Sequence, residues 1–95
     1  MSAVATVTVE WTEVMPDGQE SWDVAGVVTV TRGREQVTFE SERLVMGTLE
    51  LARELASARE KRRMHLVGER FQAASTPFGL QRRVIREYQI LGLVT

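Results

Sequence analysis

The chain has 95 residues, a formal net charge of −1, 43% hydrophobic and 26% charged residues, and no cysteine. This composition predicts one globular domain over residues 1–95, and the lack of cysteine excludes disulfides, thiolate catalysis and zinc sites built on cysteine. No apolar run has the length of a membrane span and no signal peptide opens the chain, so we expect a cytoplasmic protein without a membrane partner.

The first 40 residues predict an antiparallel meander of three strands. Residues 3–14 alternate between apolar and polar side chains and are rich in Val, Thr and Trp, the pattern of a half-buried strand. Turns are predicted at Gly18 and Gly33, which delimit further strands over residues 21–31 and 36–40. The side chains expected to pack under a helix are Trp11, Trp22, Val28, Val37 and Phe39.

Residues 41–63 predict one long helix that packs across this meander. Ser41 suits the N-cap, and the basic residues up to Arg63 suit the negative end of the helix macrodipole. Apolar residues recur at the spacing of one helical face, namely Leu44, Val45, Leu49, Ala52, Leu55 and Ala56.

Residues 64–94 allow two interpretations. The helical spacing of the apolar residues on either side of Pro77 predicts two shorter helices. The alternative is a β-hairpin of residues 65–73 and 82–94, in which Arg86 would point inward. We favour the helices because a buried arginine is costly. The predicted fold class is therefore α+β, with a three-stranded antiparallel meander, one long central helix and two shorter C-terminal helices.

The sequence offers little for catalysis. His65 is the single histidine, no serine lies in a Gly-x-Ser-x-Gly elbow, and no pattern of histidine and carboxylates has the spacing of metal ligands. The seven glycines are scattered and form no phosphate-binding loop. We therefore expect no enzymatic activity, no cofactor and no metal.

The basic residues are the strongest candidates for a binding site. Residues 1–50 carry three arginines and nine carboxylates, which gives −6, whereas residues 51–95 carry nine Lys or Arg and four glutamates, which gives +5. Such asymmetry is typical of a basic binding face, or of two halves that attract each other. The candidates for contact with a partner or a phosphate are Arg59, Arg62, Arg63, Arg70, Arg82, Arg83 and Arg86.

Protein binding is the first function consistent with these features. A three-stranded meander has two unpaired edges, and residues 3–9 and 36–39 are the candidates for them. A valine-rich edge accepts a strand from a protein partner or from a second copy. The sequence therefore predicts a non-enzymatic interaction module, an assembly, inhibitor or regulatory factor. It would form homodimers or bind a protein partner through a β-edge and the basic residues 51–95.

The alternative is a small DNA-binding regulator. Interpreted as two helices, residues 64–94 resemble the end of a helix-turn-helix unit of the winged type, whose second helix often closes with a similar Leu-Gly-Leu-Val. The resemblance implies a nucleic-acid partner whose phosphates contact the arginines between Arg59 and Arg86.

Overall fold

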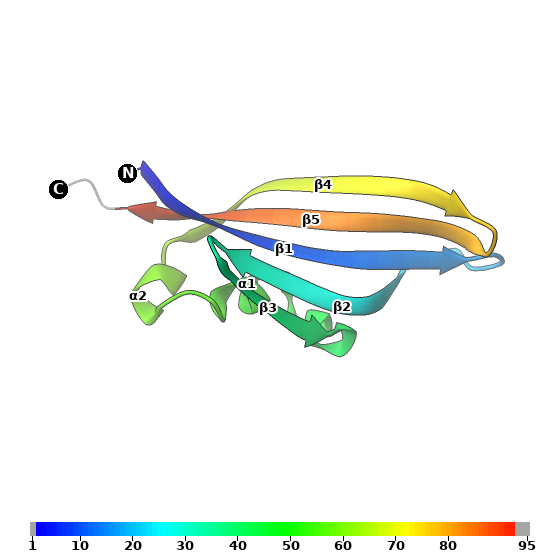
Figure 1. Ribbon diagram of the computed structural model, residues 1–95, viewed down its shortest axis with the longest axis horizontal. Coiled ribbons are helices and arrows are strands. Elements are labelled where there is room, and N and C mark those ends of the chain that lie inside the picture. The colour runs from blue at the N-terminus through cyan, green and yellow to red at the C-terminus, as the bar shows by residue number, and fades with distance from the viewer. Residues whose placement is uncertain (1, 93–95) are drawn as a thin grey trace.

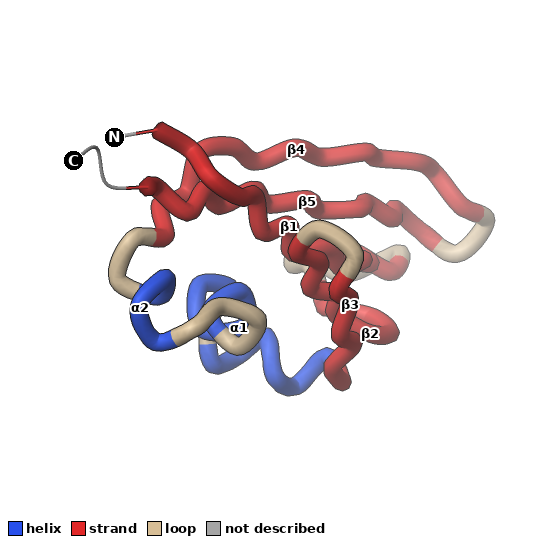
Figure 2. The backbone as a smooth tube through the Cα atoms, turned by 60° about the vertical axis from the view of Figure 1, so that its left-hand side comes forward, coloured by secondary structure: helices blue, strands red, loops and turns tan. Residues whose placement is uncertain are grey.

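The computed structural model describes residues 2–92, and these form one five-stranded antiparallel sheet in the order β3-β2-β1-β5-β4 (Figure 1). The strands are β1 (Ser2–Pro16), β2 (Asp23–Arg32), β3 (Glu35–Glu40), β4 (Met64–Thr76) and β5 (Gly79–Gly92). Three short helices connect β3 to β4, namely the 3₁₀ helix η1 (Ser41–Met46) and the α-helices α1 (Thr48–Arg53) and α2 (Ala58–Lys61). All three lie against the same face of the sheet (Figure 2).

The predicted long helix over residues 41–63 is wrong, because the chain breaks it twice. Gly47 has a φ of 108°, which no helical residue adopts, and it separates η1 from α1. A second break precedes Ser57, which starts α2 with a capping box. The Ser57 side chain accepts a hydrogen bond from the Glu60 backbone N–H, and the Glu60 carboxylate accepts one from the Ser57 N–H.

The two predicted C-terminal helices are also wrong, since β4 and β5 form a long hairpin. Both strands run closer to the turn than the hairpin alternative placed them, so that Thr76 pairs with Gly79. Arg86 does point inward, but its guanidinium is satisfied there by Glu69 and Thr48. The free-energy cost of burying Arg86, which argued against a hairpin, is therefore offset by these hydrogen bonds. Residues 93 and 94 of that alternative lie outside the described residues.

β1 lies in the middle of the sheet. It pairs with β2 on one side and, from Ser2 to Pro16, with β5 on the other. The expectation that residues 3–9 form a sheet edge is therefore wrong. The expected edge at residues 36–39 does lie in an edge strand, β3, and the second edge in the described chain is β4.

The core lies between the helices and the sheet face that they cover. Its buried residues are Val7, Val9, Trp11, Val28, Val30, Leu51, Ala52, Ala56, Met64, Val84, Tyr88 and Ile90. Of the side chains expected to pack under a helix, Trp11 and Val28 are buried and Phe39 packs at the margin of the core. Trp22 and Val37 lie outside this cluster.

The sheet is longer than its helical cover. The molecule measures 55 × 22 × 21 Å, and β1, β4 and β5 project beyond the helices toward the hairpin turn (Figure 1). No helix within residues 2–92 is both long enough and apolar enough to cross a membrane.

Candidate functional site

The candidate site is the outer edge of β4. This strand has 13 residues and pairs with β5 along one side. No strand of the described chain pairs with its other side. The backbone N–H and C=O groups on that side therefore have no strand partner within the described chain, which makes them a template for a strand from another molecule.

Apolar side chains accompany this edge. Leu66, Val67 and Phe71 are 55%, 49% and 52% exposed. Phe71 lies on the face that the helices cover elsewhere, because its partner in β5 is the core residue Val84. Val67 sits at a bulge in the pairing with β5. A long unpaired strand with half-exposed apolar residues is typical of an interaction site.

The opposite edge, β3, is better protected than β4. It has six residues and carries a glutamate at each end, Glu35 and Glu40. Its aromatic residue Phe39 packs against the core, with the Arg43 guanidinium 5.0 Å from the ring centroid. A short, charged edge strand discourages pairing with another chain. β4 is therefore the stronger candidate of the two edges.

A stack of aromatic and cationic side chains holds Phe71 in place. The Arg82 guanidinium carbon lies 4.9 Å from the Phe71 ring centroid and 4.2 Å from that of Trp22. Arg82 Nε also donates a hydrogen bond to Glu13 Oε1 at 2.6 Å. Each cation–π contact contributes about 0.5–1 kcal/mol at such partly exposed sites. The side chain of Phe71 is thus oriented by residues of β1, β5 and the segment before β2.

Four of the seven candidate arginines lie on strands and are paired with glutamates. The pairs are Arg70–Glu87, Arg82–Glu13, Arg83–Glu10 and Arg86–Glu69. Two of the glutamates belong to β1, so part of the charge asymmetry of the sequence reflects attraction between the acidic and basic halves. Each of these four arginines therefore connects two neighbouring strands through an ion pair.

Arg86 also links the sheet to α1. Its Nη1 donates a hydrogen bond to Thr48 Oγ1 at 2.6 Å, and the Tyr88 hydroxyl donates to the same oxygen at 2.8 Å. Burial lowers the pKa of Arg86, but the hydrogen bond and ion pair with Glu69, and then the Tyr88 hydroxyl, outweigh burial and raise the pKa above its ordinary value. Arg86 is therefore a charged structural residue, and sequence patterns gave no sign of its partner Thr48.

The other three candidates come together at α2. Arg59, Arg62 and Arg63, with Ala58, line a hollow of about 400 Å³. Together with Lys61 they form what we term the α2 cluster. In the part of the chain that the structure describes, no member of the α2 cluster forms an ion pair.

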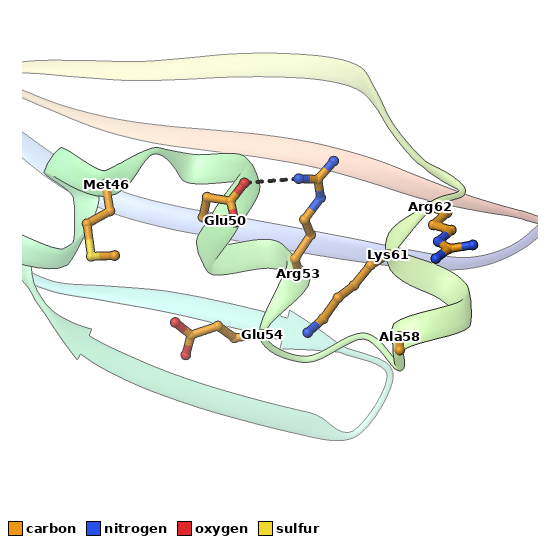
Figure 3. Close-up of a pocket in the computed structure, with 7 residues that line it drawn as sticks. All are labelled: Met46, Glu50, Arg53, Glu54, Ala58, Lys61 and Arg62. Carbon is orange, nitrogen blue, oxygen red and sulfur yellow. Dashed lines mark hydrogen bonds and ion pairs between the residues drawn. The ribbon is translucent and has the colours of Figure 1, made fainter.

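A neighbouring hollow of about 480 Å³ lies between α1 and α2 (Figure 3). Lys61 and Arg62 line it from the α2 side. Glu50 and Glu54 line it from the α1 side, where Arg53 Nη1 donates a hydrogen bond to Glu50 Oε1 at 2.9 Å. This hollow therefore carries both charges, and the first hollow is the more strongly basic.

No family model, curated protein or solved structure matches the chain significantly. Among residues 2–92, no group of three or more histidine, aspartate or glutamate side chains is arranged to hold a metal ion.

Proposed function

We propose that the protein is a non-enzymatic protein-interaction module whose partner adds a strand to the outer edge of β4. The observation that supports this proposal is the 13-residue edge of β4, which has no strand partner in the described chain and carries three half-exposed apolar residues. In strand addition, backbone hydrogen bonds give affinity and contacts with alternate side chains give specificity.

The surroundings of β4 favour this use. The ion pairs Arg70–Glu87 and Arg86–Glu69 tie β4 to β5, and the Arg82 stack holds Phe71. An edge that is already ordered loses little conformational entropy when a partner binds.

Photo-crosslinking tests the proposal. A photo-crosslinking amino acid replaces Gln72 in β4 or, as a matched control, Gln36 in β3; both positions are exposed and lie on edge strands. We expect the crosslinker at position 72 to form a defined covalent adduct with a protein partner, and the crosslinker at position 36 to form none. Phe71→Lys should reduce that adduct about tenfold or more, because loss of an aromatic anchor costs at least about 1.4 kcal/mol.

Val37→Lys is the control substitution, since Val37 is a partly exposed apolar residue of the other edge strand. It should leave the adduct unchanged. Equal adducts from positions 72 and 36, or no adduct from position 72 with any protein, would contradict the proposal.

We propose phosphate binding by the α2 cluster as a second candidate function. The observation in its favour is that the four cations of the cluster have no ion-pair partner among the described residues, whereas the strand arginines are paired with glutamates. The phosphate contacts of a nucleic acid would then involve Arg59, Arg62 and Arg63 rather than Arg82, Arg83 and Arg86. Because residues 64–92 form strands and not two helices, insertion of a helix-turn-helix unit into a DNA groove has no support.

A titration with random-sequence duplex DNA tests this second function. Four phosphate contacts should weaken binding about 10²-fold between roughly 50 and 200 mM salt. We expect the double substitution Arg59→Glu with Arg62→Glu to abolish binding. Arg34→Glu is the control, because Arg34 is an exposed arginine in a turn that also forms no ion pair within residues 2–92. Absence of binding at the lower salt concentration would eliminate this candidate.

A further inference from the structure

We infer that the partner at β4 is a second copy of the same chain, and that two five-stranded sheets join across a two-fold axis into one continuous antiparallel sheet. This inference rests on the proposed function, because it names the partner that the β4 edge binds. Antiparallel pairing of one edge with its own copy requires a two-fold axis perpendicular to the sheet.

The pleat of β4 restricts the registers that such a dimer can adopt. Residues directly opposite each other in an antiparallel pair lie on the same face of the sheet. Glu69 and Phe71 share the face covered by the helices, since they pair with Arg86 and Val84, while Arg70 lies on the other face. Because faces alternate regularly from Gly68 to Thr76, every allowed register of this stretch places one residue of β4 opposite its own copy.

Charge selects among these registers. An axis at Glu69 or at Arg70 would place like charges directly opposite each other, which is destabilising. An axis at Phe71 instead places Arg70 opposite Gln72 and Glu69 opposite Ala73 of the second copy. Identical aromatic residues then face each other, and aromatic pairs across strands are stabilising.

The aromatic contact separates the remaining registers. An axis at Gln72 also avoids like charges in direct opposition, but it places Phe71 opposite Ala73 of the second copy and forms no aromatic pair. An axis at Phe71 pairs residues 68–74, and the bulge at Val67 lies outside this stretch. The axis at Phe71 is therefore the register that both avoids like charges in direct opposition and pairs the aromatic residue with its own copy.

The side chains on the helix-covered face support the same register. Trp22, Arg82 and Phe71 already form a row that ends at the edge, with Phe71 about half exposed. Directly opposite residues have Cβ atoms about 4.5–5.5 Å apart, so the ring of the second copy would cover the exposed side of Phe71. The row would continue across the axis through the second copy's Phe71, Arg82 and Trp22.

A charge-swap experiment tests the inference. We expect wild-type protein to be a dimer by size-exclusion chromatography with light scattering, and F71K and F71E each to be monomeric, because each places like charges on the axis. An equimolar mixture of F71K and F71E should restore the dimer. F78K is the control, since Phe78 is the 84% exposed aromatic residue of the hairpin turn, and it should remain dimeric.

Single cysteines test the register, because the chain has no cysteine of its own. F71C should form an intermolecular disulfide under mild oxidation, since its Cβ would lie within disulfide range of its copy. A73C should not, because Ala73 would face Glu69 rather than itself. A disulfide from A73C but not from F71C would overturn the register.

The outcomes separate this inference from the proposed function. A monomeric wild-type protein that still yields an adduct with a different protein from position 72 would overturn the inference and support the proposed function. A monomer with no such adduct would overturn both. A dimer that F71K does not disrupt, or that the mixture does not restore, would overturn the placement of the axis at Phe71.

Discussion

Gly79→Ala is expected to lower the free energy of unfolding by about 3 kcal/mol or more. Gly79 begins β5 with a φ of 138°, a conformation that residues with a side chain rarely adopt. A Cβ at this position would lie 2.4 Å from the Met15 carbonyl oxygen and 2.9 Å from Pro16 Cα. The methyl group would meet backbone atoms of β1, which cannot move without breaking the pairing of β1 with β5.

Gly68→Ala is the matched control for this substitution. Gly68 lies in the same hairpin, its φ is not in the left-handed region, and the nearest atom to an added Cβ is Glu87 Oε2 at 3.9 Å. We expect Gly68→Ala to change the free energy of unfolding by no more than about 0.5 kcal/mol. Urea unfolding followed by tryptophan fluorescence measures both variants. Equal stabilities would contradict the close approach of β1 to the start of β5.

Leu51→Ala is expected to lower the free energy of unfolding by about 3–5 kcal/mol. Leu51 is 1% exposed and is among the largest fully buried side chains of the described chain. It belongs to α1, and the helical segment between β3 and β4 contributes few other buried apolar side chains, Ala52 and Ala56 among them. Because a domain of this size is stable by only about 5–15 kcal/mol, the cavity would remove a large part of its stability.

Val45→Ala is the control for the helical cover. Val45 is 90% exposed in η1, so we expect its truncation to change stability by no more than about 0.5 kcal/mol. Denaturant titration should show a lower midpoint for Leu51→Ala. The dependence of the unfolding free energy on denaturant concentration should be unchanged, because the folded and unfolded states keep their compactness. A similar loss for both variants would mean that α1 does not cover the sheet as described.

The N-terminal meander could be predicted from the sequence because its information is local. The alternation of apolar and polar side chains in residues 3–14 predicts a strand, and Gly18 and Gly33 predict the turns that follow two of the strands. Both signals depend only on residues close together in the sequence. The boundaries within residues 41–63 were missed although one signal was present. Ser57 followed by Glu60 is the sequence signature of a capping box, and it marks the start of α2.

The C-terminal hairpin could not be decided locally. The apolar residues between Val84 and Ile90 fit both helical and strand spacing, and the inward position of Arg86 argued against a strand. Only Glu69 and Thr48, which are distant in the sequence, make that position favourable. Tertiary contacts therefore decided between two locally acceptable structures.

The candidate site depended on the same decision. Once residues 64–92 are strands, β5 occupies the free side of β1, and β4 becomes the edge. The seven candidate arginines were found from composition, but the division between paired strand arginines and the α2 cluster depends on the positions of Glu10, Glu13, Glu69 and Glu87. No spacing rule along the chain contains that information.

The central position of β1 has a consequence for how the protein is made. Val7 pairs with Tyr88, so, of the five strands described, the first to be synthesised pairs with the last. Until β5 has left the ribosome, the nascent chain exposes a long valine-rich strand whose second neighbour does not yet exist. Pairings this distant in the sequence slow folding and lengthen the period in which a chain can aggregate. The rate of translation, and chaperones that bind extended apolar segments, should therefore affect the yield of this protein more than that of a helical protein of similar length.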